Sequence, residues 1–128
     1  MQYARHFTLN EANMLLVNLK PLVQQLIELK SVLDKRGYDI YRHQYFGGLG
    51  PNGTGEFPKE MEELVAIVKK IAAEGVQIKS IDNGLLDFPH VRRNGDEVFL
   101  CWKNGEAEIM FWHEIEIGFA GRKKIDEL

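Results

Sequence analysis

Apolar residues in the first part of the chain recur with a helical period. They follow one another in alternating steps of three and four, at Ala12, Leu15, Leu19, Leu22, Leu26, Leu29 and Leu33. This alternation is typical of a coiled-coil seam. Thr8 can cap the start of such a helix, with Glu11 three residues later to close a capping box. The pattern predicts a helix over residues 9–36, kinked where Pro21 removes a backbone hydrogen bond.

A second helix is predicted between Pro58, which suits a first helical turn, and Gly75, which suits a helix end. Its apolar positions repeat the same steps, at Met61, Leu64, Val68 and Ile71. The two helices predict an antiparallel hairpin. A second apolar flank on the first helix, at Leu16, Val23 and Ile27, makes its stripe too wide for one partner helix. Either the sheet or a second copy of the chain could cover this surplus, and the conformation of residues 37–56 stays open.

After Gly75 the apolar period changes to two, which is typical of strands. Asn-Gly pairs occur at Asn83–Gly84, Asn94–Gly95 and Asn104–Gly105, each between runs rich in β-forming residues. Asn-Gly is a strong signal for a two-residue hairpin turn, because both turn residues need positive φ. The spacing predicts an antiparallel meander of three to four strands, over residues 76–82, 85–92, 97–103 and 106–113. Pro89 interrupts the second strand, so the pairing of residues 76–92 stays open.

Two-residue turns would fix the register of the meander. They place Asp82 opposite Leu85, Arg93 opposite Asp96 and Lys103 opposite Glu106. In this register Trp102 and Phe111 face the helices, and Trp112 faces the other way. Asp87 and His113 then lie at opposite ends of the sheet, about 20 Å apart at ~3.3 Å per residue. We therefore do not expect these two side chains to meet within one chain.

The fold class that follows is α+β, with a long N-terminal helical hairpin packed on a C-terminal antiparallel meander. The 128 residues are interpreted as one domain. Its parts are a helical half over 7–75, a sheet half over 76–113 and a C-terminal tail over 114–128.

Composition narrows the function classes. A net charge of −3 argues against nucleic acid as the main partner, because phosphate binding needs a basic surface. No run approaches the ~20 apolar residues of a membrane span, and the N-terminus has no apolar signal-peptide region. A cytoplasmic location is therefore expected. The single cysteine, Cys101, excludes an internal disulfide and is interpreted as a small buried hydrophobe. The glycine-rich stretch 47–55 lacks the phosphate-loop pattern.

Candidate chemistry is concentrated in FWHEIEIGFAGR, where His113, Glu114 and Glu116 lie close together. If the chain turns after His113, then His113 and Glu116 could bind a divalent metal such as zinc or manganese. The alternative is the polar end of a strand, with His113 paired to Asp96. The spacing does not match an established ligand pattern, so both interpretations stay open.

The chain resembles an uncharacterised prokaryotic family catalogued as domain of unknown function 2203. The resemblance rests on RHFTLNEANMLL with the LKPLV that follows, and on GLLDFP, LCWKNGE and FWHEIEIGFAGR. It implies no activity. It does imply a set of signature positions, which are Asp87, Trp102, Glu106, His113, Glu114, Gly118, Phe119, Gly121 and Arg122.

Two functions from different classes follow. The favoured one is a non-enzymatic, homodimeric binding or scaffold module, because apolar surface is in surplus and no catalytic motif is present. The alternative is a metal-dependent or small-molecule enzyme with a site around His113, Glu114, Glu116 and Arg122. Asp87 and Trp102 complete the candidate ligand-binding residues.

Overall fold

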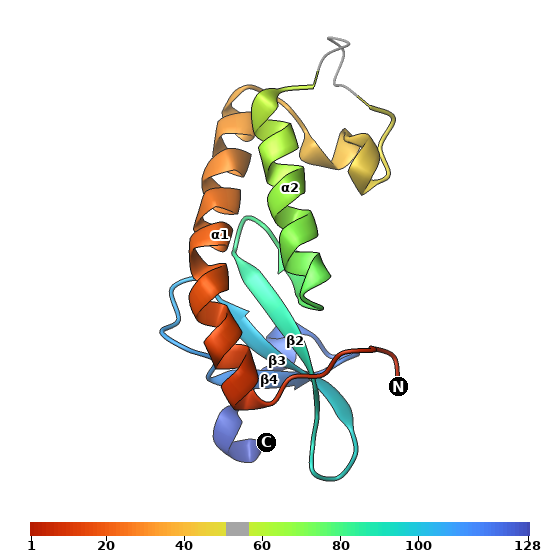
Figure 1. Cartoon of the computed structure of the whole chain (residues 1–128), viewed down its shortest axis with the longest axis vertical. Helices are drawn as coiled ribbons and strands as arrows, with labels where there is room; N and C mark the ends of the chain where they lie inside the picture. Colours follow the sequence, from red (N-terminus) through yellow and green to blue (C-terminus); the bar gives the residue numbers. More distant parts are fainter. Residues whose placement is uncertain (51–56) are drawn as a thin grey trace.

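The computed structural model describes residues 1–50 and 57–128. Two helices, α1 (Leu9–Lys35) and α2 (Lys59–Ala73), lie side by side and precede an antiparallel sheet (Figure 1). The strands are β1 (Gln77–Ser80), β2 (Leu85–Val91), β3 (Glu97–Lys103), β4 (Phe111–Glu114) and β5 (Lys123–Lys124), in that spatial order. The predicted α+β class is confirmed, but the sheet has a fifth strand in the segment predicted as a tail.

Helix α1 starts as its sequence predicts. The Thr8 side chain accepts from the backbone N–H of Glu11, and the Glu11 carboxylate accepts from the N–H of Thr8. Pro21 lies within the continuous helix. The buried face differs from the predicted seam at every second position. Its members are Ala12, Leu16, Leu19, Val23, Leu26, Lys30 and Leu33, whereas Leu15, Leu22 and Leu29 are half-buried.

Lys30, the charged residue on this buried face, forms ion pairs that compensate for the burial of its ammonium group. Its ammonium lies 2.9 Å from carboxylates of Asp34 and Asp82. Burial lowers the pKa of Lys30, but the hydrogen bonds to these two carboxylates outweigh it and raise the pKa above its ordinary value. Lys30 therefore stays charged and joins α1 to the turn after β1.

The connection from α1 to α2 contains two 3-10 turns, Ile40–Arg42 and Gln44–Phe46. Part of the predicted glycine-rich loop, residues 51–55, lies outside the described residues. Arg36 and Glu60 form an ion pair of 2.8 Å that links the end of α1 to the start of α2. Among the described residues, neither helix is long and apolar enough to cross a membrane.

The predicted strand register is wrong at the β2–β3 hairpin. Val91 lies opposite Glu97, and the Arg92 N–H donates to the carbonyl of Asp96. The loop therefore has three residues, 93–95, where two were predicted. A shift of one residue moves every side chain of a strand to the other face. Asp87 consequently lies on the sheet face away from the helices.

The β3–β4 register is also wrong, by three residues. Cys101 lies opposite Phe111, so the chain between Asn104 and Met110 stays outside the sheet. The Trp102 indole N–H donates to the carbonyl of Glu106, and the N–H of Ile109 donates to the side chain of Asn13. The two-residue turn at Asn104–Gly105 does form, closed by the Glu106 N–H that donates to the Lys103 carbonyl, but the strand pairing does not continue after it. An odd shift exchanges the faces of β4, so Trp112 joins the core and Phe111 does not.

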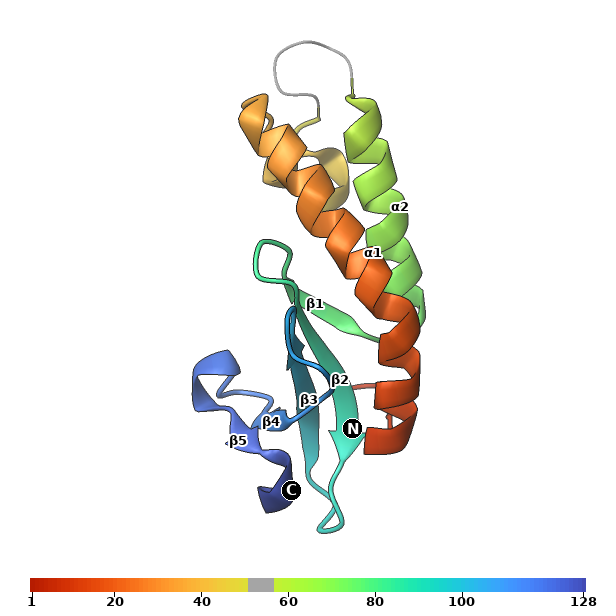
Figure 2. The ribbon, with the colours of Figure 1, turned by 90° about the vertical axis from the view of Figure 1, so that its left-hand side faces the viewer.

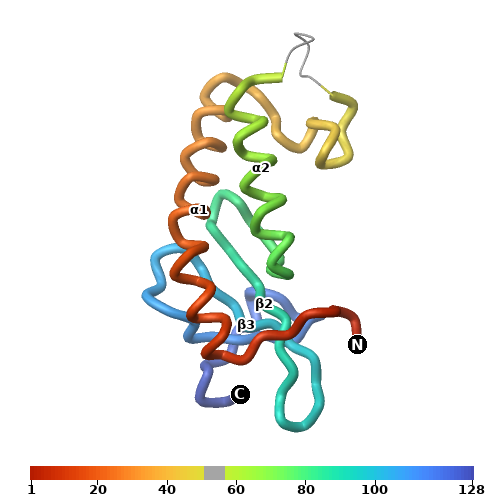
Figure 3. The backbone as a smooth tube through the Cα atoms, in the orientation of Figure 1, coloured from red at the N-terminus to blue at the C-terminus, as the bar shows by residue number. Residues whose placement is uncertain are grey.

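Pro89 is accommodated because β1 is short. Its pairing with β2 runs only from Gln77 opposite Asp87 to Ser80 opposite Leu85. Pro89 therefore lies beyond the end of β1, and its carbonyl accepts from the N–H of Phe7 instead. Figure 3 shows this N-terminal segment passing beside β2.

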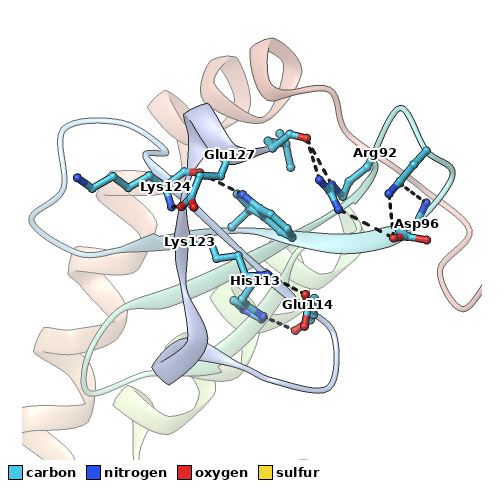
Figure 4. Close-up of polar contacts among 10 residues, drawn as sticks. Arg92, Asp96, His113, Glu114, Lys123, Lys124 and Glu127 are labelled. Atoms are coloured by element: carbon cyan, nitrogen blue, oxygen red, sulfur yellow. Dashed lines mark hydrogen bonds and ion pairs between the residues drawn. The ribbon is translucent and has the colours of Figure 1, made fainter.

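Other parts of the chain pack on both faces of the sheet. Leu86, Phe88, Val98, Leu100, Trp102 and Trp112 pack in the core with α1 and α2. The C-terminal segment lies on the opposite side of the sheet from α1 (Figure 2). It is held there by several bonds, including Lys123 to Glu114 at 2.9 Å and Arg92 to the last carbonyl, at Leu128 (Figure 4). The C-terminal segment therefore covers part of the sheet face that the helices leave open.

Candidate functional site

Three chemically reactive side chains meet on the sheet face away from the helices. Asp87 comes from β2, Cys101 from β3 and His113 from β4. A carboxylate oxygen, the sulfur and a ring nitrogen all lie within 4.8 Å of one another. The residues are 1%, 0% and 2% exposed. Three adjacent strands thus each contribute one potential metal ligand to a buried cluster.

The imidazole of His113 is fixed at both nitrogens. Its Nε2 lies 3.0 Å from each carboxylate oxygen of Asp87, and its Nδ1 lies 2.8 Å from the carbonyl of Glu114. A carbonyl can only accept, so Nδ1 carries a proton. Burial lowers the pKa of His113, but the hydrogen bond to Asp87 and the one to Glu114 outweigh it and raise the pKa. These two hydrogen bonds therefore favour the charged form of the His113 ring.

This contact corrects two sequence predictions. Asp87 and His113 do meet within one chain, because the register shifts place Asp87 opposite Cys101 and His113 opposite Phe99, only two residues apart along β3. The alternative that paired His113 with Asp96 is also wrong. Asp96 contacts Arg92 and Asn94 in the β2–β3 loop.

Cys101 is a protonated thiol in this setting. Burial, followed by the nearby charge of Asp87 and a hydrogen bond to it, raises the pKa of the thiol to about 12. A thiol with so high a pKa is a poor nucleophile at neutral pH. A bound metal ion reverses this situation, because a coordinating thiol loses its proton. The cluster is therefore better suited to metal binding than to covalent catalysis.

Aromatic and cationic side chains surround the cluster. The ring of Phe99 lies 5.5 Å from that of His113, and the ammonium of Lys79 lies 4.7 Å from the Phe99 ring centre. Arg122 stacks on Phe111, which is the cross-strand neighbour of Cys101. The cluster thus lies in a low-dielectric environment in which charges on the ligands interact strongly.

Comparison with known proteins identifies the chain at the level of a family. Residues 5–125 match the family described as an uncharacterized conserved protein, DUF2203. The chain belongs to this family. The match includes all three cluster residues and confirms the resemblance seen in the sequence. No curated protein and no solved structure matches the chain.

The other predicted site residues of this DUF2203 chain lie around the cluster in different ways. Trp102 is buried on the helix side of the sheet and donates to the Glu106 carbonyl. Glu114 contributes its carbonyl to His113 and its carboxylate to Lys123. Glu116 is exposed in the turn after β4 and is not part of the buried cluster. The structure thus groups His113 with ligands other than the predicted Glu116.

Cys101 is the cluster residue that the sequence interpretation did not select. Its apolar neighbours in VFLCW indicate a buried strand, and a buried cysteine in a strand is ordinarily a small hydrophobe. The sequence does contain a signal for Cys101, which shares one face of its strand with Phe99 and Lys103. That signal becomes useful only with the correct register, which aligns Asp87, Cys101 and Phe111 across three strands.

Proposed function

We propose that this protein binds one transition-metal ion through Asp87, Cys101 and His113. The observation that carries the proposal is the convergence of an oxygen, a sulfur and a nitrogen within 4.8 Å in a buried site. Ligands of these three kinds are those that Zn²⁺ prefers, at about 2.0–2.3 Å from the ion. The thiol favours zinc over manganese, which prefers oxygen ligands.

The hydrogen bonds of His113 support this proposal. Metal-bound histidines ordinarily donate their second ring N–H to a carbonyl or carboxylate, which fixes the orientation of the ring. The Nδ1–Glu114 bond of 2.8 Å has this form and leaves Nε2 facing Asp87. An ion in the cluster would take the place of the Nε2 proton. Three protein ligands leave one coordination position for water or a small ligand, as in catalytic zinc sites.

Cobalt binding tests the proposal directly, because Cys101 is the only cysteine in the chain. Untagged protein is stripped with a chelator and titrated with Co²⁺, and its ultraviolet and visible spectra are recorded. We expect a thiolate-to-cobalt charge-transfer band that saturates at about one ion per chain, as a single three-ligand site requires. Zn²⁺ should displace the cobalt and abolish the band.

Two variants assign the band to the cluster. Cys101→Ser should abolish it, and Glu116→Ala should leave it unchanged, since Glu116 lies outside the cluster. The absence of a charge-transfer band in the parent protein would contradict the proposal. Loss of the band in Glu116→Ala would show that metal binding also needs Glu116, which the sequence predicts as a ligand with His113.

We also propose a second candidate function, a non-enzymatic homodimeric binding module in the cytoplasm. Its support is an open groove of about 490 Å³ between α1 and α2, whose apolar lining is Leu29, Val32, Ala66 and Ile67. The half-buried Leu15, Leu22 and Leu29 recur every seven residues, as in a helix that packs on another helix. A second copy of the chain could complete this packing.

Sedimentation equilibrium tests the dimer. We expect the parent to have twice the mass of one chain, and Val32→Glu to have the mass of one chain, because a buried charge would oppose association. Ser31→Glu, on the preceding residue of the same helix, is the matched control and should stay dimeric. A parent protein that sediments as a monomer would overturn the dimer.

A further inference from the structure

Several contacts hold Arg122 beside the cluster of Asp87, Cys101 and His113. It follows the 3-10 turn Phe119–Gly121 in the C-terminal segment, and its side chain is 16% exposed. The guanidinium carbon lies 4.1 Å from the ring centre of Phe111 and 4.3 Å from that of Phe119. Its Nη1 donates to both carboxylate oxygens of Glu106, at 3.1 and 3.0 Å. Two rings and one carboxylate therefore restrict this side chain to one orientation.

The orientation places Arg122 on the sheet face that carries Cys101. Phe111 lies directly opposite Cys101 in the β3–β4 ladder, so a guanidinium stacked on Phe111 covers the same level of the sheet. The positive charge of Arg122 lowers the pKa of the Cys101 thiol, against the larger effects of burial and Asp87 that raise it. Arginine stays charged at all relevant pH values and presents several donors in a fixed plane.

We infer that Arg122 is a positioning residue of the metal site, which donates a hydrogen bond to the Cys101 sulfur when that sulfur is a metal-bound thiolate. Glu106, Phe111 and Phe119 keep the guanidinium in place for this bond. The inference rests on the proposed metal-binding function and assigns the outer contact of the sulfur ligand. Glu114 has the corresponding part for His113.

This assignment differs from a purely structural role. Arg122 could act only by tying the C-terminal segment to Glu106, which would leave the sulfur unaffected. A hydrogen bond to a metal-bound thiolate lowers the energy of the sulfur lone pairs. Its loss therefore shifts the thiolate-to-metal charge-transfer band to longer wavelength, whereas loosening of a distant segment does not. Outer contacts of this kind typically change metal affinity about 10–100-fold.

The experiment compares the parent protein with Arg122→Met and Lys123→Met. Each variant removes one positive charge from the same segment, but Lys123 is paired with the exposed Glu114 and not with the cluster. Zn²⁺ affinity is measured by competition with a chromophoric chelator, and the charge-transfer band is recorded with Co²⁺. We expect Arg122→Met to weaken Zn²⁺ binding about 10–100-fold and to shift the band to longer wavelength. Lys123→Met should match the parent in both measurements.

A second variant covers the case in which Arg122→Met does not fold. If Arg122→Met does not fold, as judged by circular dichroism, Arg122→Lys replaces it. That variant keeps the charge but loses the planar donors, and it should show the band shift with a smaller loss of affinity. Parent-like affinity and an unshifted band in the folded variant would overturn the inference while leaving the metal site intact. A parent protein without any charge-transfer band would overturn both proposals.

Discussion

Replacing Asp87 with alanine is expected to lower the free energy of unfolding of the metal-free protein by about 3–5 kcal/mol. The reason is the burial of its partner. His113 is 2% exposed and its Nε2 lies 3.0 Å from both oxygens of Asp87. Removal of the carboxylate leaves the buried ring nitrogen without its hydrogen-bond partner. Urea denaturation, monitored by tryptophan fluorescence, measures the change.

A double-mutant cycle separates the pair from its surroundings. His113→Ala should cost much less in the Asp87→Ala background than in the parent, because the interaction is already lost there. Glu116→Ala is the matched control for removal of a nearby carboxylate. It should change the free energy of unfolding by no more than about 0.5 kcal/mol, as expected for an exposed residue. Additive effects of the two cluster substitutions would show that Asp87 and His113 do not stabilise each other.

Replacing Trp102 with alanine is expected to lower the free energy of unfolding by about 3–5 kcal/mol. Trp102 is 1% exposed and packs in the core between the sheet and the helices. Its indole N–H also donates to the Glu106 carbonyl at 2.9 Å. The substitution therefore creates a large cavity and releases the loop that sets the β3–β4 register. Thermal and urea denaturation measure the loss of stability.

Trp102→Phe separates the two contributions. The phenyl ring retains much of the buried volume but cannot donate a hydrogen bond, so a loss of about 1–3 kcal/mol is expected. Hydrogen exchange at the Ile109 N–H, which donates to Asn13, reports whether the loop stays in place. Faster exchange in Trp102→Phe would support the role of the indole in the loop. Parent-like stability of the alanine variant would contradict the placement of Trp102 in the core.

The helices and the order of the strands are predictable because the signals that specify them are local. The capping box of Thr8 and Glu11 and the helix end at Gly75 act within a few residues of each other. Their contacts therefore form independently of the tertiary structure. The period of two after Gly75 correctly predicts strands, and the Asn-Gly pairs correctly predict where the chain reverses.

The register of the sheet is not predictable from the turns alone. Asn104–Gly105 does form a turn. The chain after it is held by the side chains of Trp102 and Asn13, and not by backbone pairing with β3. Asn13 lies 96 positions from Ile109 in the sequence. A contact over such a separation leaves no local pattern, yet it decides which residue of β4 meets Cys101.

The sequence by itself determined the α+β class, the start of α1 and the family to which the chain belongs. Those features depend on periodicity, capping and matched segments, all of which are read along the chain. Only the tertiary structure decided that Asp87, Cys101 and His113 meet. Two odd register shifts, one between β2 and β3 and one between β3 and β4, exchanged the faces of β2 and β4 and brought the three side chains together. A side chain in a strand changes face with each residue, so a site built across strands depends on contacts that fix the register to a single position.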